Sequence, residues 1–566
     1  MNITGKSAAP GVVLGSIYIY NKKFIIPKES FLNRDERQSH LDRYLLIKEQ
    51  AKTELEELKI SLQKIDPAKA EIFGAHQEIV DDITINEEIP ARILSDLWSG
   101  DWAIFQVYET IITVLKQTAD SLISERSDDF DDVRALLLRL WYGQKNERLS
   151  SLKDPVIIAA YDLKPSDTAS FDKNKVLAIL TETGGVTSHS AIIAKSYGIP
   201  AILGIEGLLS LVKQGQQAAV NATEGTVILD PKDDIVTEYN IKNKDFLRDR
   251  EEAFTYMDKE GLTSCGVKID IGINLSDCDS ENDLKNYVDM AGLFRTEFLF
   301  LGRNTLPSEE EQFISYKKVL ENYGQKPFVL RTLDIGADKL LSCMDNKSDE
   351  SPFSTNRGIR FCFNNPGIFK TQIRAALRAS VYGNLWLMLP MISSLDCIRK
   401  AKKLISDVCL ELEKEGIPVA LFKTGIMIEV PSIALISAFA AKEVDFASIG
   451  SNDLCQYVCA ADRADSADAG YYQSYHPAMF HLIKEVTGSF LQEGKPISIC
   501  GELGSDPLVV PVLIGLGLRK LSMGGASIAP VKRTIASLTI EKAQQIAQEV
   551  LQLQTAAQIE EYQKNR

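Results

Sequence analysis

The residue best suited to nucleophilic chemistry is a histidine that follows a glycine-rich turn. Residues 176–180 form an apolar run typical of a buried strand, and a helical pattern starts at Ala191. Two glycines and a Thr-Ser pair suited to helix capping stand between them, so His189 falls in the first helical turn. The positive end of a helix dipole disfavours imidazolium and favours a bound phosphoryl group, so we expect a neutral His189 that can accept phosphate. A turn with a chemically idle surface histidine remains the alternative.

A second set of polar residues stands at the ends of short apolar runs in the second half of the chain. Eight such runs alternate with helical patterns from residue 267 onward, which predicts a (β/α)₈ barrel, whose active site lies at the C-terminal strand ends. The expected strands are 267–274, 292–297, 328–334, 385–391, 425–430, 445–450, 497–502 and 518–524. The side chains at their ends are Arg295, Glu297, Arg331, Asp334, Glu429, Asn452, Asp453, Cys500 and Glu502.

These residue types indicate a phosphorylated substrate. Two arginines can bind a phosphate or a carboxylate through paired hydrogen bonds, and two carboxylates can hold a Mg²⁺ ion that also contacts substrate phosphate. The sequence has neither a histidine-rich set for zinc nor a Walker A loop. Together with His189, the barrel rim therefore predicts phosphoryl transfer through a phosphohistidine, a reaction that depends on positioning and charge neutralisation.

The elements around His189 predict a composite domain. The run at 11–20 reads as a strand that needs partners far along the chain, and 155–159 and 176–180 are the expected ones. Residues 1–30 and 146–230 are therefore expected to form one α/β domain, with residues 31–145 inserted.

The insertion is expected to be helical throughout, with an apolar stripe that includes Leu41, Leu45 and Leu46. It holds 14 Lys and Arg against 23 Asp and Glu, a net charge of −9 out of −15 for the whole chain. This excess fits an acidic docking surface for a small basic protein, because such fields steer association. Solvated helix faces alone would explain it equally well.

Residues 231–260 are expected to form an exposed helical linker that leads to the barrel, residues 261–566.

The chain has 566 residues, 25% of them charged, with no apolar run of the ~18 residues that span a bilayer and no signal-peptide layout. Nine cysteines without a C-x-x-C pair favour reduced thiols and a cytoplasmic location. The negative net charge argues against nucleic acid as a partner.

Six motifs together resemble enzyme I, the phosphoenolpyruvate–protein phosphotransferase family of the bacterial sugar phosphotransferase system. The resemblance covers essentially the whole chain and implies an α/β phosphohistidine domain with an inserted helical bundle, followed by the (β/α)₈ barrel. The motifs are GGVTSH at 184–189, GLFRTE at 292–297, LRTLDIG at 330–336, IEVP at 428–431, SIGSNDL at 448–454 and CGEL at 500–503.

The resemblance also implies roles for residues and partners. The family binds phosphoenolpyruvate and Mg²⁺, passes the phosphoryl group to the phosphocarrier protein HPr at the helical insertion, and forms homodimers through the barrel. His189 would carry the phosphoryl group, and Cys500 would protonate the pyruvate enolate. The other implied residues are Thr168, which would orient the histidine; Arg295, Arg331, Asn452, Asp453 and Arg463 at the substrate; Glu429 and Asp453 at Mg²⁺; and Arg357 in support.

Some positions depart from the family pattern, namely Val186, Ala337, the Gly524–Gly525 pair and the stretch before Arg357. None of them removes a residue with a direct chemical role, so they put rate and specificity in question. A divergent regulator or scaffold with reduced or lost turnover therefore stays open as the alternative function. A dikinase or synthase that also uses phosphoenolpyruvate would need a nucleotide-binding domain, for which the chain has no room.

Overall fold

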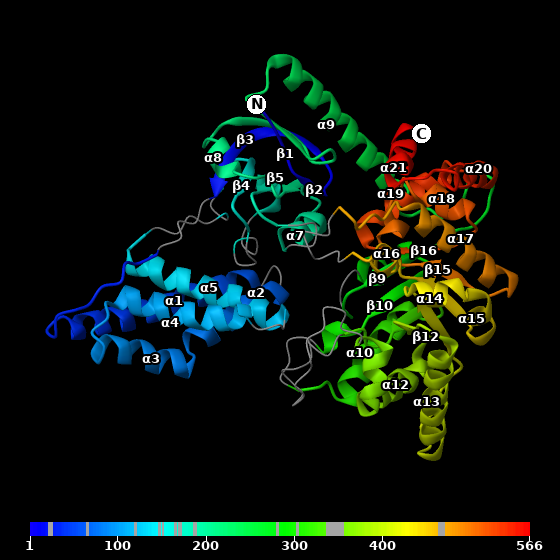
Figure 1. The fold of residues 1–566 in the computed structure, drawn as a ribbon, viewed down its shortest axis with the longest axis horizontal. Coiled ribbons are helices and arrows are strands. Elements are labelled where there is room, and N and C mark those ends of the chain that lie inside the picture. Colours follow the sequence, from blue (N-terminus) through cyan, green and yellow to red (C-terminus); the bar gives the residue numbers. More distant parts are fainter. Residues whose placement is uncertain are drawn as a thin grey trace. The chain divides into compact units, whose positions relative to one another are not determined.

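The chain folds into two compact units, residues 1–248 and 249–566, seen in a computed structural model (Figure 1). No helix in the described segments is long and apolar enough to cross a membrane. The structure describes residues 1–20, 26–63, 67–117, 121–144, 149, 152–163, 167, 172–184, 189–278, 282–300, 305–335, 356–461 and 470–566.

A mixed sheet forms the core of the first unit. The described strands follow the order β1-β8-β7-β3-β4-β5-β6-β2. Apolar side chains cover both faces, in one cluster around Ile158 and Ile179 and another around Ile157 and Val220. Its strands are β1 (Asn2–Thr4), β2 (Lys6–Ala9), β3 (Val12–Tyr20), β4 (Val156–Ala160), β5 (Val176–Thr181), β6 (Ala201–Leu203), β7 (Gln217–Asn221) and β8 (Thr226–Leu229).

The pairing of β3 spans the whole insertion. β3 pairs in parallel with β4, from Ile17 opposite Ile157 to Tyr20 opposite Ala160, as the sequence predicted. Its other neighbour is the antiparallel β7, which the sequence did not single out, and β5 lies one strand further away, beside β4. Helices α7 (His189–Tyr197) and α8 (Leu208–Leu211) complete this part of the chain.

The insertion is helical, as expected, and its core includes part of the predicted stripe, since Leu41 packs against it. Tyr44, Ile47, Ala51 and Leu55 of α1 are buried at helical spacing, whereas Leu45 and Leu46 are exposed (48% and 60%). The stripe was wrong at these two leucines because the packing partners select the face that carries Tyr44. The helices are α1 (Arg37–Gln63), α2 (Pro67–Val80), α3 (Ile83–Leu94), α4 (Gly100–Gln117) and α5 (Ser121–Trp141).

Helix α9 (Asp233–Phe254) lies within residues 231–260, where the sequence predicted a helix, and its two ends pack differently. Near its start, Tyr239 is buried with Val12 and Ala219 of the first sheet. Near its end, Arg533 donates hydrogen bonds to the Asp249 carbonyl and the Glu252 carboxylate.

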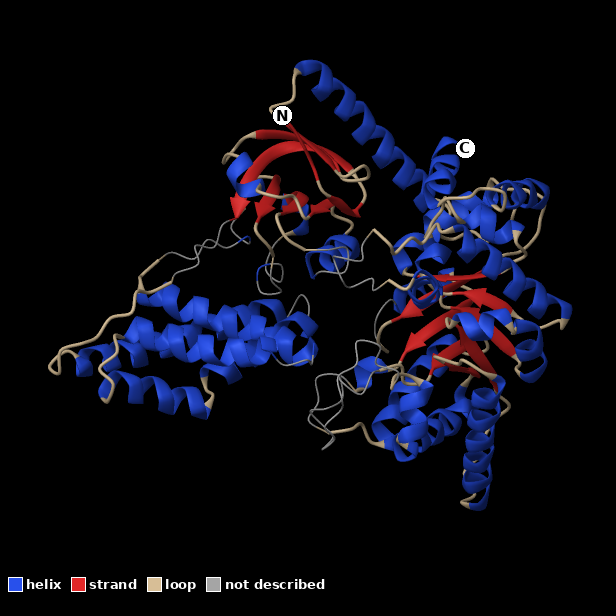
Figure 2. Ribbon diagram, in the orientation of Figure 1, coloured by secondary structure: helices blue, strands red, loops and turns tan. Residues whose placement is uncertain are grey.

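Eight described parallel strands of the second unit close into a barrel with the order β9 to β16, which confirms the predicted architecture (Figure 2). The strands are β9 (Asp270–Leu275), β10 (Met290–Arg295), β11 (Pro327–Arg331), β12 (Asn384–Leu389), β13 (Lys423–Ile428), β14 (Phe446–Ile449), β15 (Ile497–Ile499) and β16 (Lys520–Met523). The helices are α10 (Glu309–Tyr323), α11 (Ile359–Asn364), α12 (Pro366–Ala379), α13 (Leu395–Lys414), α14 (Pro431–Leu435), α15 (Ser437–Glu443), α16 (Ser451–Cys459), α17 (Pro477–Gln492), α18 (Val510–Gly515), α19 (Gly525–Ala536), α20 (Ile540–Val550) and α21 (Ala556–Asn565).

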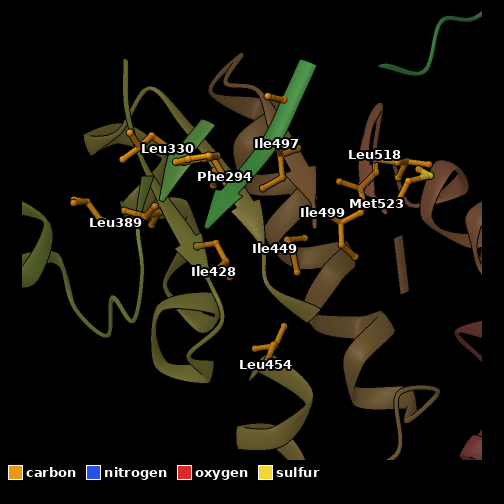
Figure 3. Close-up of a cluster of buried hydrophobic side chains, with 14 of the residues drawn as sticks. Phe294, Leu330, Leu389, Ile428, Ile449, Leu454, Ile497, Ile499, Leu518 and Met523 are labelled. Carbon is orange, nitrogen blue, oxygen red and sulfur yellow. The ribbon is translucent and has the colours of Figure 1, made fainter. Parts of the chain in front are cut away.

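Alternate residues of the strands belong to two apolar clusters, as the two-residue period of a strand requires. The larger cluster lies between strands and helices and includes Phe294, Leu330 and Ile428 (Figure 3). The smaller one fills the barrel and ends at Cys500, next to the C-terminal ends of the strands. Its other members are Met290, Leu293, Val329, Trp386, Met388, Met427 and Phe446.

The expected strand at 385–391 ends early, at Leu389. Met391 has a φ of 54°, in the left-handed region that side chains other than glycine adopt at a cost of about 1–2 kcal/mol. A strand cannot continue through that conformation. Pro390, which has no N–H for a strand ladder, is the sequence signal for this end, although Met391 itself is neither glycine nor asparagine.

Two glycines in helices of the barrel differ in how closely neighbouring atoms pack around them. A Cβ on Gly515 of α18 would lie 2.0 Å from the Ala543 carbonyl oxygen of α20, whereas a Cβ on Gly488 of α17 would meet nothing within 4 Å. We expect Gly515→Ala to lower the free energy of unfolding by about 1–3 kcal/mol and Gly488→Ala to raise it by about 0.5–1 kcal/mol. Calorimetric melting of the barrel unit measures both, and equal effects would contradict this packing.

Candidate active site at the barrel rim

The strand register places the two predicted arginines next to each other. Arg295 ends β10, Arg331 ends β11, and the two residues are register partners in the parallel pair. The other predicted residues follow neighbouring strands at the same rim: Glu429 directly after β13, Asn452 and Asp453 in the first turn of α16 after β14, and Cys500 directly after β15.

A buried carboxylate joins two arginines at this rim. The Asp334 side chain is completely buried, and its Oδ2 lies 2.9 Å from Nη1 of Arg331 and 2.9 Å from Nη2 of Arg357. The Nε of Arg357 donates to Oδ1 at 3.0 Å. Burial alone would raise the pKa of Asp334, but the charges of Arg331 and Arg357 outweigh it and hold this pKa below its usual value. Asp334 is therefore the shared anion of two guanidinium groups.

Glu297 fixes the other side of Arg331. Its Oε1 accepts from Nη2 of Arg331 at 2.9 Å and from the Asp334 backbone N–H at 3.2 Å. The Nε of Arg331 is buried and has no hydrogen-bond partner in the described part of the chain. Because an unpaired buried donor is costly, this nitrogen is a group that a bound anion could satisfy.

Glu429 is completely buried, and only one of its two carboxylate oxygens has a hydrogen-bond partner among the described residues. Its Oε1 accepts at 2.5 Å from the backbone N–H of Met391, the residue with the left-handed conformation. Its Oε2 has no partner among the described residues. Burial, followed by the charges of Asp334 and Asp453, raises the pKa of Glu429 to about 8. A bound cation would pair with Oε2 and would also offset the cost of a negative charge at this buried position.

Three carboxylates converge where such a cation would bind. One oxygen each of Asp334, Glu429 and Asp453 lies within 4.8 Å of the others, and all three residues are buried. Oxygen ligands of this kind suit Mg²⁺, so the donor set fits the ion. Asp453 also pairs with Arg357, Nη1 to Oδ1 and Nη2 to Oδ2, both at 3.4 Å.

Cys500 lies between the barrel interior and the rim. It is only 5% exposed, and its Sγ donates to the Ile449 carbonyl at 3.6 Å. Burial raises the pKa of its thiol, although the Ser448 hydroxyl and the charge of Arg331 oppose the shift. The group is therefore a protonated thiol at neutral pH.

Gly501 lets the next residues approach closely. A Cβ at Gly501 would lie 1.9 Å from Oγ of Ser451 and 2.9 Å from Oδ1 of Asn452. The same Asn452 oxygen accepts from the Glu502 backbone N–H at 2.9 Å. Only glycine permits this contact between the ends of β14 and β15.

His189 is the first residue of α7, which puts it in the predicted first turn. Its neighbour Ser190 is fully buried, and its Oγ lies 3.2 Å from both Oδ1 of Asp162 and the Leu163 carbonyl oxygen. The His189 side chain, the expected cap at 187–188, Thr168 and Arg463 lie outside the described residues.

The sequence assigned no role to several groups that the structure brings to the rim. Asp334 and Glu297 stand at expected strand ends, so their position was a usable signal, but nothing marked them as partners of arginines. The Met391 amide carried no signal, because a backbone group has no residue type. Two buried hydroxyls, of Thr332 and Ser451, also lack hydrogen-bond partners among the described residues.

Comparison with known proteins identifies the family. Residues 250–540 match the PEP-binding domain of PEP-utilising enzymes, residues 152–225 their mobile domain, and residues 4–126 their N-terminal domain. A Staphylococcus carnosus (strain TM300) protein named phosphoenolpyruvate-protein phosphotransferase is 36% identical over 575 residues, which cover 100% of this chain and 99% of that protein. The chain belongs to the phosphoenolpyruvate–protein phosphotransferase family.

Other members of the phosphoenolpyruvate–protein phosphotransferase family are also similar over most of the chain. The protein of this name from Bacillus sp. (strain S) is 38% identical over 512 residues, 90% of this chain and 89% of its own length. That from Bacillus subtilis (strain 168) is 34% identical over 561 residues, 98% of each chain. The resemblance seen in the sequence motifs is therefore confirmed along the whole length.

The raised pKa of Glu429 predicts a pH-dependent stability for the metal-free protein. Between the usual carboxyl pKa of 4.5 and about 8, the folded state keeps a proton that the unfolded chain releases, so the free energy of unfolding falls as pH rises. We expect Glu429→Gln to stabilise the chelator-treated protein at about pH 8.5, by a margin that shrinks as the pH is lowered to about 5. Thermal melts across this range measure the effect.

Glu485→Gln is the matched control, because it removes the same charge from an exposed position on α17. It should leave the pH profile of the melting temperature unchanged. If the melting temperature of Glu429→Gln changed with pH in the same way as that of the wild type, Glu429 would not be a buried, protonated carboxyl group in the metal-free protein.

Proposed function

We propose that this chain is an enzyme I-type phosphotransferase that takes the phosphoryl group of phosphoenolpyruvate onto His189 and passes it to a histidine of HPr, releasing pyruvate. The observation that carries the proposal is the convergence of Arg331, Arg357, Glu429, Asp453 and Cys500 at one rim. These groups match the needs of one substrate: guanidinium groups for phosphate, carboxylates for Mg²⁺ and a thiol for the enolate.

The arginines are assigned to the phosphoryl group. Arg295 and Arg331 are register neighbours, and the unpaired Nε of Arg331 gives a buried donor that a phosphate oxygen would satisfy. Asn452 and Arg463 are assigned to the rest of the substrate. In support, Asn452 is held through its side-chain oxygen by the Glu502 N–H, which fixes its orientation at the rim.

Glu429 and Asp453 are the proposed Mg²⁺ ligands. The unpaired Oε2 of Glu429 and the buried carboxylate trio support this assignment. Mg²⁺ bound there would neutralise negative charge on the phosphoryl group during transfer. Asp334 is assigned a different role, because both of its oxygens already accept short hydrogen bonds from Arg357, at 3.0 and 2.9 Å, whereas those to Asp453 are 3.4 Å long.

In the proposed reaction, a neutral His189 nitrogen attacks phosphorus, the P–O bond to the enol oxygen breaks, and its electron pair stays on the enolate. Thr168 would orient the histidine ring. The first turn of α7 supports a neutral histidine and a stable phosphohistidine, since its dipole disfavours imidazolium and favours the dianion. The Cys500 thiol then gives its proton to the methylene carbon of the enolate, which yields pyruvate and a thiolate that water reprotonates.

The helical insertion, residues 31–145, is proposed to dock HPr, and its net charge of −9 supports a basic partner. Not every acidic residue there is available, because Asp81 pairs with Lys48 and Lys52, and Asp82 caps α3. The docking charge would come from other acids, such as the exposed Glu78 and Glu87.

The barrel, residues 261–566, is proposed to mediate a homodimer. The exposed Leu435 and Phe439 (65% and 60%) give it apolar surface that a second copy could cover. We assign the phosphohistidine domain to residues 1–30 and 146–230 and the linker to residues 231–260. The proposed location of the protein is the cytoplasm.

His189→Ala tests the carrier residue. Incubation with phosphoenolpyruvate labelled in the phosphoryl group, Mg²⁺ and HPr should label the wild-type protein and HPr, and neither protein in the variant, because the variant lacks the proposed phosphoryl carrier. The label should be acid-labile, as a phosphoramidate is. Label on the variant would refute the assignment, and an unlabelled wild type would favour the scaffold alternative.

Cys500→Ala tests the proton donor. The variant should bind phosphoenolpyruvate normally but form pyruvate at least about tenfold more slowly, within the ~10²–10⁴ range typical of a general acid. Steady-state pyruvate formation measures the loss. Cys409→Ala is the control, because Cys409 is a half-buried cysteine on α13, away from the strand ends. Near-normal turnover in Cys500→Ala would leave Cys500 with a packing role only.

A further inference from the structure

Arg357 has nearly all of its hydrogen-bond donors occupied by carboxylates. A guanidinium group has five N–H donors. Nε and Nη2 donate hydrogen bonds to the two oxygens of Asp334 at 3.0 and 2.9 Å. Nη1 and Nη2 donate to the two oxygens of Asp453, both at 3.4 Å. One N–H group of Nη1 is left over, too few for paired recognition of a phosphoryl group.

The two contacts of Arg357 differ in strength and in accessibility. The Asp334 side chain is fully buried and bound at short distances, whereas Asp453 is held at 3.4 Å and is also one of the three carboxylates suited to a cation. The guanidinium group can therefore leave Asp453 and keep its place through Asp334.

We propose that Arg357 is the resident cation of the metal-free site: it competes with Mg²⁺ for Asp453, and Mg²⁺ binding frees its outer N–H groups for the substrate phosphoryl group. The inference rests on the proposed function, because it takes Asp453 as a Mg²⁺ ligand. It assigns Arg357 a role in coupling the metal to the substrate, beyond binding the substrate alone.

Electrostatics gives the direction of the coupling. A positive charge that pairs with Asp453 both offsets part of the carboxylate's attraction for Mg²⁺ and repels the ion in a poorly solvated site. Once Mg²⁺ holds Asp453, the positive charge of Arg357 needs another anion, and the phosphoryl group supplies it. Coupling free energies are reciprocal, so the metal strengthens substrate binding and the substrate strengthens metal binding by the same factor.

Direct metal binding tests the proposal without reliance on turnover. Mn²⁺ replaces Mg²⁺ as the probe, and electron paramagnetic resonance counts free Mn²⁺ in titrations of the full-length protein without phosphoenolpyruvate. We expect Arg357→Gln to bind Mn²⁺ at least about tenfold more tightly than the wild type, because the competing charge is gone. Arg357→Lys keeps the charge and should stay close to the wild type.

A second titration measures the coupling. With phosphoenolpyruvate present, Mn²⁺ affinity should rise in the wild type by a larger factor than in Arg357→Gln, because only the wild type has a guanidinium group to release. Arg360→Gln is the matched control. It removes the same charge three residues away, at a half-buried position in α11, and should leave Mn²⁺ affinity within about twofold.

The outcomes separate this inference from the proposed function. Equal Mn²⁺ affinity for the wild type and Arg357→Gln overturns the competition, while the metal site itself stands. Weaker binding by Arg357→Gln also overturns it, since Arg357 would then support the site. If the wild type and every variant fail to bind Mn²⁺ even with phosphoenolpyruvate, the proposed metal site fails and the inference with it.

Discussion

The ion pairing of Asp334 with Arg331 and Arg357 is the interaction on which the rim depends. Taking a carboxylate and two guanidinium groups out of water is expensive, and an unpaired buried charge would cost several kcal/mol. Asp334 offsets that cost, since each guanidinium group lies 2.9 Å from its Oδ2. Without it, two like charges would repel each other at the place where a phosphorylated substrate needs them together.

The backbone at Gly358 and Met391 helps to hold this cluster in place. Gly358 has a φ of +60°, and a Cβ there would lie 2.8 Å from the Met391 side chain and 3.1 Å from Oδ1 of Asp334. Met391 in turn adopts its left-handed conformation and points its N–H at Glu429. Strained backbone persists when the surroundings over-determine it, and here it positions a carboxylate. Gly358 and Met391 thus link the arginine cluster to Glu429, one of the carboxylates proposed to bind metal.

The proposed chemistry is divided between the two units. His189 starts a helix in the first unit, while the phosphate, metal and proton-donor groups belong to the barrel of the second. The first unit keeps its sheet intact across a long insertion, because β3 and β4 pair directly although more than a hundred residues separate them. An inserted helical bundle with its own core can therefore vary in surface charge without disturbing the strand that precedes His189.

The sequence by itself determined the barrel, the helical insertion, the strand before His189 and the rim positions of Arg295, Arg331, Glu429, Asp453 and Cys500. Apolar periodicity and strand ends are local signals, and the fold class follows from their order. Only the tertiary structure decided that Tyr44 rather than Leu45 faces the core of the insertion, that β7 is the second neighbour of β3, and that Asp334 pairs with both arginines. The core face of α1, the second neighbour of β3 and the pairing of Asp334 with Arg357 all depend on a partner further along the chain, and residue type alone does not say which face, strand or charge that partner will be.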